Sequence, residues 1–82
     1  MEKLIAGLPK GSGEEVRVSL SEFKGKQYID LRVYFENDEG EWKPTKKGVA
    51  LHVGQFNKLM DALKEAEDAL RENGLLPEDE EE

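Results

Sequence analysis

Apolar residues recur at every second position in two neighbouring segments of the chain. In residues 15–23 and 26–36 these positions are Val16, Val18, Leu20, Ile29, Leu31 and Val33. A period of two is typical of a strand with one buried face. The connection between the segments is short, and Gly25 supplies a turn conformation that other residues resist. The sequence therefore predicts an antiparallel hairpin.

Turn-forming residues divide the next part of the chain. Residues 37–40 read Asn-Asp-Glu-Gly, which is typical of a turn, and residues 41–44 are expected to form a short third strand. Pro44 lacks an amide donor, so we expect it at an edge or a bulge. Residues 45–48 are expected to turn again, and residues 49–53 alternate as a fourth strand. The prediction is a four-stranded antiparallel meander with one apolar face.

An apolar stripe with helical spacing follows the strands. Between Gln55 and Asn73 it consists of Phe56, Leu59, Met60, Leu63, Ala66 and Leu70. Gly74 comes just past the end, where glycine commonly stops a helix. We expect this helix to cover the apolar face of the sheet and part of its stripe to meet a second subunit. The predicted fold class is α+β: a four-stranded antiparallel meander followed by one C-terminal helix, in a dimer.

Glycine, proline and charge mark the two ends of the chain. Residues 1–13 are predicted to be a flexible lead-in, whose Leu4, Ile5 and Leu8 either dock on the domain or have no role. Residues 14–74 form the folded domain, and residues 75–82 an acidic tail. This tail either serves solubility or folds back on the basic residues and competes with a ligand.

The chain is short, at 82 residues, and it contains no cysteine. A core of this size is marginal on its own, and oligomerisation is a common remedy, so a homodimer is expected. No apolar run is long enough to span a bilayer, and we expect an intracellular protein with no membrane partner. Its location would be the cytoplasm or nucleoid in a bacterium and the nucleus in a eukaryote.

Charge is unevenly distributed, although the formal net charge is -7. Five acids lie in the terminal sequence Pro-Glu-Asp-Glu-Glu-Glu, and residues 55–73 hold five acids against three bases. Residues 23–48 contain six basic and five acidic residues. The predicted sheet is therefore mixed to basic, and the negative net charge is weak evidence against a nucleic-acid partner.

Aromatic and basic residues share the outer face of the predicted sheet. Alternation places Phe23, Tyr28, Arg32 and Tyr34 there, with Trp42 close by. Rings stack on unpaired bases while lysine and arginine contact phosphates, so this face suits single-stranded nucleic acid. The alternative is ordinary packing, since aromatic residues are common in strands. Phe35 is also close by, but strict alternation places it on the opposite side, with Ile29 and Val33, so it reaches the outer face only if the end of the strand twists or bulges.

The segment from residue 14 to about residue 70 resembles the positive cofactor four (p15) family of transcriptional coactivators, which bind single-stranded DNA. The matching pieces are Phe23-Lys24-Gly25-Lys26, Ile29-Asp30-Leu31-Arg32, Tyr34, Gly40-Glu41, Lys43-Pro44, Lys46-Lys47-Gly48 and Phe56. The resemblance implies four strands, a helix that takes part in dimerisation, and a groove for DNA across the paired sheets. It also implies stacking by Phe23 and Phe35, and phosphate contacts by Arg32, Lys43, Lys46 and Lys47, with Lys24 and Lys26 at the hairpin tip.

Two departures from the family pattern concern aromatic residues. The family has tryptophan at the position of Phe35 and a non-aromatic residue at the position of Trp42, so we hypothesise that stacking area has moved to the next strand. The serine- and lysine-rich N-terminal region of eukaryotic members is absent, which suits a compact bacterial or phage-type member.

We therefore predict a homodimeric single-stranded-DNA-binding protein with little sequence preference, acting in transcription regulation or DNA maintenance. The predicted contacts are Phe23, Lys24, Lys26, Tyr28, Arg32, Tyr34, Phe35, Trp42, Lys43, Lys46 and Lys47. Asp30 is expected to pair with a neighbouring basic side chain, and His52 is expected to be an ordinary strand residue. No enzymatic activity, cofactor or metal is expected, because no catalytic or metal-ligating motif occurs. The alternatives are a protein–protein interaction module of the transcription machinery and an RNA-preferring relative.

Overall fold

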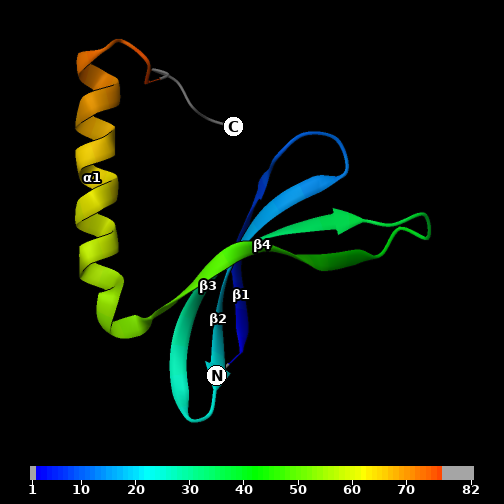
Figure 1. Ribbon diagram of the computed structural model, residues 1–82. Helices are drawn as coiled ribbons and strands as arrows, with labels where there is room; N and C mark the ends of the chain where they lie inside the picture. The colour runs from blue at the N-terminus through cyan, green and yellow to red at the C-terminus, as the bar shows by residue number, and fades with distance from the viewer. Residues whose placement is uncertain (1, 77–82) are drawn as a thin grey trace.

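The computed structural model describes residues 2–76, which form one antiparallel sheet followed by a helix (Figure 1). The elements are β1 (Lys3–Pro9), β2 (Glu14–Phe23), β3 (Lys26–Glu36), β4 (Trp42–His52), the 3₁₀ turn η1 (Val53–Gln55) and α1 (Phe56–Glu72). The four strands follow one another in the order β1-β2-β3-β4. The prediction of a four-stranded meander and one C-terminal helix is confirmed.

The predicted hairpin is present as β2 and β3. Phe23 pairs with Lys26, and the two residues between them have positive φ angles, 53° at Lys24 and 80° at Gly25. This is the backbone of a two-residue type I′ turn, whose twist matches that of the flanking strands. Val16 pairs with Val33, so the alternating apolar residues of both strands lie on one face, here called the apolar face.

The prediction of a flexible lead-in over residues 1–13 is wrong for Lys3–Pro9, which form strand β1. Leu8 pairs with Val16 and Pro9 pairs with Glu15 of β2. Glycine and proline suggested a break in structure, but β1 is an edge strand and Pro9 is its last residue. A proline at that position removes no hydrogen bond from the interior of the sheet.

The predicted turn over residues 45–48 is also wrong, because residues 41–44 and 49–53 do not form separate strands. Trp42–His52 is one strand, β4, with an irregularity in its pairing to β3. Tyr34 pairs with Pro44 and Arg32 with Gly48, so residues 45–47 lie opposite Val33 alone. The local signals of a turn came from this bulge, which bends the strand without ending it.

The helix does not cover the sheet, contrary to the prediction. Figure 1 shows α1 standing apart from the strands, to which η1 connects it. Its apolar stripe is open to solvent, with Phe56 49% and Leu63 54% exposed. The glycine stop is confirmed: Gly74 has a φ of 69°, and the Leu75 amide donates a 2.8 Å hydrogen bond to the Leu70 carbonyl oxygen.

The described chain has almost no core of its own. Ile29, at 7% exposure, is the buried hydrophobic residue of residues 2–76. The radius of gyration is 15.0 Å, whereas a compact domain of this length would have about 12 Å. No helix in residues 2–76 is long and apolar enough to cross a membrane. The acidic sequence from Pro77 to Glu82, for which a solubility or competing role was predicted, lies outside the described residues.

Candidate nucleic-acid interface

The side of the sheet opposite Ile29 collects the polar and aromatic residues of β2 and β3. Arg17 pairs with Arg32, Ser19 with Asp30, and Ser21 with Tyr28. Directly paired residues share a face, so the predicted outer face is present; it is called the polar face below. Its residues on these two strands are Glu15, Arg17, Ser19, Ser21, Phe23, Lys26, Tyr28, Asp30, Arg32 and Tyr34.

Arg17 joins two of the predicted rings on this face. Its guanidinium carbon lies 4.5 Å from the centre of the Tyr34 ring and 5.5 Å from that of Trp42. Its Nε donates a 2.7 Å hydrogen bond to Oε1 of Glu15. Arg17 was not among the contacts predicted from the sequence. The same alternation that places Phe23 on the polar face could have identified Arg17 as a neighbour of the predicted rings.

Arg32 is held by contacts within the sheet. Its Nε and Nη2 donate hydrogen bonds of 3.1 and 2.9 Å to the two carboxylate oxygens of Asp30. The predicted pairing of Asp30 with a basic side chain is confirmed. The hydrogen bonds to Asp30 raise the pKa of Arg32 above its usual value. Because the guanidinium is occupied, Arg32 fixes the local structure as well as contributing charge.

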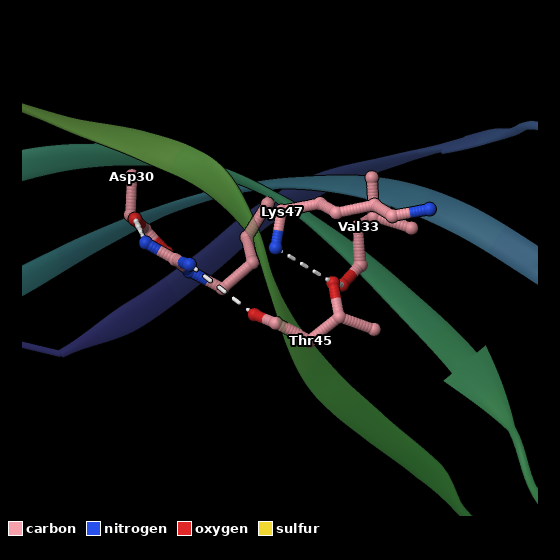
Figure 2. Close-up of polar contacts among 5 residues, drawn as sticks. Asp30, Val33, Thr45 and Lys47 are labelled. Atoms are coloured by element: carbon pink, nitrogen blue, oxygen red, sulfur yellow. Dashed lines mark hydrogen bonds and ion pairs between the residues drawn. The ribbon is translucent and has the colours of Figure 1, made fainter.

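The third contact of Arg32 reaches the bulge of β4. Its Nη1 donates a 3.2 Å hydrogen bond to the carbonyl oxygen of Thr45. The Thr45 hydroxyl donates a 2.8 Å bond to the Val33 carbonyl oxygen and accepts a 3.1 Å bond from the Lys47 amide (Figure 2). The bulge is therefore a hydrogen-bonded structure with a defined shape.

Close approach of the strands beside the bulge requires a glycine. A Cβ atom at Gly48 would lie 2.5 Å from the Leu31 carbonyl oxygen and 2.9 Å from the Arg32 Cα. Neither backbone atom is free to move away within the sheet. The order Thr45-Lys46-Lys47-Gly48 thus encodes a bulge that presents two consecutive lysines.

Both lysines of the bulge are exposed, and within residues 2–76 neither forms an ion pair. In Figure 2 the Lys47 side chain extends away from the Asp30 carboxylate. Lys43, which precedes the bulge, lies 3.5 Å from a carboxylate oxygen of Glu41. Lys46 and Lys47 are therefore the cations of β4 best placed to meet an external anion.

The hairpin tip carries a ring and two more cations. Phe23 is 62% exposed, and the Lys24 ammonium lies 5.3 Å from the centre of its ring. Lys26 pairs directly with Phe23. One face of an uncovered ring is thus available next to positive charge, as stacking on an unpaired base requires.

Two of the predicted contacts, Phe35 and Lys43, lie on the apolar side of the sheet. Phe35 follows the alternation of Val33, as predicted, and pairs with Lys43. Tyr28 stays on the polar face, where its ring meets that of His52 edge-on with centres 5.8 Å apart. The structure brings most of the predicted contacts together on the polar face and the bulge, with Phe35 and Lys43 behind them.

Comparison with known proteins agrees with this architecture. Residues 10–62 match the family model described as Transcriptional Coactivator p15 (PC4). The chain belongs to the PC4 family. An RNA polymerase II transcriptional coactivator of Arabidopsis thaliana, KIWI, is 41% identical over 54 residues, which are 66% of this chain and 50% of the relative. This member of the PC4 family therefore spans about half the length of that relative.

Solved structures extend the comparison to the fold. A PC4 homologue from Burkholderia pseudomallei superimposes with a TM-score of 0.74 at 24% identity, over 80% of this chain and 89% of the other. That likeness concerns the fold alone. MoSub1 in complex with single-stranded DNA is 32% identical, with a TM-score of 0.66 over 88% of this chain and 83% of its own. A solved structure that resembles this chain in sequence and fold therefore contains bound single-stranded DNA.

Proposed function

We propose that this protein binds single-stranded DNA with little sequence preference, through the polar face and the bulge of β4. The observation that carries the proposal is the gathering of uncovered rings and cations: Phe23 with Lys24 at the hairpin tip, and Lys46 with Lys47 in the bulge. Rings stack on any base, and cations follow the backbone, so such a surface distinguishes strands by pairing and not by sequence. The bound strand in the MoSub1 complex supports the assignment.

We further propose that the protein acts as a homodimer through α1. The apolar stripe of the helix and the apolar face of the sheet are both uncovered in the described chain. Burying one large apolar side chain contributes about 1.5–3 kcal/mol, and a single copy leaves most of this unrealised. A second copy packed along α1 would supply the missing core and place two polar faces in one particle.

The process served follows from this activity. Transcription regulation is favoured by the coactivator relatives, and DNA maintenance is compatible with binding that ignores sequence. Both would take place inside the cell. No chemical step is assigned, since the proposed contacts hold a strand and do not transform it.

An equilibrium titration tests the proposal. A labelled single strand and its matched duplex are each titrated with the protein at two salt concentrations, with fluorescence anisotropy as the readout. We expect tighter binding of the single strand, because a duplex hides the base faces, and weaker binding at the higher salt. Equal affinity for strand and duplex would contradict stacking, and no binding at low salt would favour a protein–protein interaction module.

Competition between DNA and RNA of the same sequence addresses the remaining alternative. Stacking and phosphate contacts do not exclude a 2′-hydroxyl. If the protein binds DNA as proposed, the DNA oligonucleotide should displace a bound labelled strand at least as well as the RNA oligonucleotide does. Stronger competition by RNA would identify the protein as an RNA-preferring relative.

A further inference from the structure

Arg17 is fixed in position by three neighbours on the polar face. The Tyr34 and Trp42 rings support its guanidinium, and Glu15 accepts the hydrogen bond from Nε. Within residues 2–76 the two Nη atoms make no hydrogen bond. A planar cation with its outer groups unused is thus held on a rigid strand.

A shallow hollow of about 280 Å³ opens beside this guanidinium, toward the edge strand β1. Arg17, Ser19 and Tyr34 line it from the polar face, and Lys3 and Leu4 line it from β1. Stacking surface, a hydroxyl group and an apolar wall therefore meet in one place. This combination is suited to a flat ring with polar edges.

Glu2 also lines the hollow, which bears on the ligand. Its Oε2 accepts a 3.0 Å hydrogen bond from the Glu22 amide, so the carboxylate is held near the site. A carboxylate repels a phosphate group, whereas it accepts hydrogen bonds from the amino groups of bases. Lys3 also lines the hollow, so two cations stand against this one carboxylate, and it is the stacking surface of Arg17 and not the charge that favours a base.

We propose that Arg17 and this hollow form a subsite for one unpaired base, which stacks on the outer face of the guanidinium. The Tyr34 and Trp42 rings act through Arg17, because the guanidinium lies over both of them. Bases are known to stack on guanidinium planes as they do on aromatic rings. The subsite rests on the proposed function and extends the strand path from the hairpin tip across β2 to β1.

A double-mutant cycle with two ligands tests the subsite. Wild-type protein and the variant Arg17→Lys are titrated with a thymidine oligonucleotide and with an abasic oligonucleotide of the same length and phosphate charge. Lysine keeps the charge of Arg17 and loses its plane. We expect the substitution to weaken thymidine-strand binding by roughly fivefold or more, the scale of one lost stack, and to leave abasic-strand binding within about twofold.

Two further variants serve as controls. Arg71→Lys changes an exposed arginine of α1 that is ion-paired with Glu67, and it should leave both affinities unchanged. Glu15→Gln weakens the fixation of Arg17 without touching its plane, and it should give a smaller loss confined to the thymidine strand. This second variant keeps the test decisive if Arg17→Lys does not fold.

Two outcomes would overturn the subsite while the proposed function stands. Equal losses on both strands would make Arg17 a phosphate contact, and no loss on either would make the cluster a structural feature of the sheet. Failure of the wild-type protein to bind any single strand would instead remove the proposed function and the subsite together.

Discussion

The hydroxyl of Thr45 donates a 2.8 Å hydrogen bond to the carbonyl oxygen of Val33. This bond closes the bulge of β4 against β3, at the point where Val33 faces residues 45–47. The Lys47 amide donates to the same hydroxyl, and Arg32 holds the Thr45 carbonyl. One side chain thereby fixes the backbone that carries both exposed lysines.

Replacing Thr45 with valine should destabilise the protein. The change keeps the shape of the side chain but leaves the Val33 carbonyl and the Lys47 amide without this partner. The expected cost is about 1–2 kcal/mol in the free energy of unfolding, measured by urea denaturation. Thr45→Ser keeps the hydroxyl and should stay within about 0.5 kcal/mol of wild type. Equal stability of Thr45→Val and Thr45→Ser would show that the bulge does not depend on this bond.

Replacing Leu63 with glutamate should shift the protein from dimer to monomer. Leu63 lies on the uncovered stripe of α1, and a charge buried in an interface is costly. Sedimentation velocity should show the loss of dimer, and the melting temperature should fall because a single copy has little core. Lys64→Glu, one residue further along the same helix, is the matched control. A wild-type protein that sediments as a monomer would contradict the proposed assembly.

The sequence predicted the parts of the fold that local patterns determine. Alternation and Gly25 defined the β2–β3 hairpin and its two faces, including the position of Phe35 behind the polar face. The bulge was mistaken for a turn, because its hydrogen bonds to Val33 and Arg32 join residues that are distant in sequence. Strand β1 was missed because its pairing to β2 outweighs the presence of Gly7 and Pro9.

The placement of the helix and the role of Arg17 required three-dimensional information. The apolar stripe indicates that α1 packs against a partner. It does not indicate whether this partner is the sheet of the same chain or a second copy. Pairing with Arg32 places Arg17 on the polar face. Its stacking on Tyr34 and Trp42, however, depends on the register of three strands.

Replacing Lys46 and Lys47 with glutamine should reduce the salt dependence of single-strand binding. Each neutralised phosphate contact contributes about 0.7 to the slope of log K against log salt concentration. The double variant should therefore lower the slope by roughly 1.4 while leaving the fold intact, since both side chains are exposed. The double variant Lys58→Gln and Lys64→Gln on α1 removes the same charge outside the polar face and the bulge. Equal slopes for the two double variants would place the strand elsewhere.

Replacing Phe23 with alanine should weaken binding without unfolding the domain. The ring is 62% exposed, so its removal should leave the free energy of unfolding within about 0.5 kcal/mol of wild type. Loss of one base stack should lower affinity by roughly 5- to 150-fold, the equivalent of about 1–3 kcal/mol. Leu75→Ala removes another exposed apolar side chain and should leave affinity unchanged. Wild-type affinity in Phe23→Ala would remove this ring from the proposed contacts.

Trp42 reports directly on the central claim that an unpaired strand lies on the polar face. It is the single tryptophan of the chain and lies beside Arg17 on that face. The decisive measurement is a titration with an unlabelled single strand, followed by tryptophan fluorescence. A strand on the polar face should produce a saturable change in emission that added salt reverses. Binding detected by anisotropy with the Trp42 emission unchanged would contradict it.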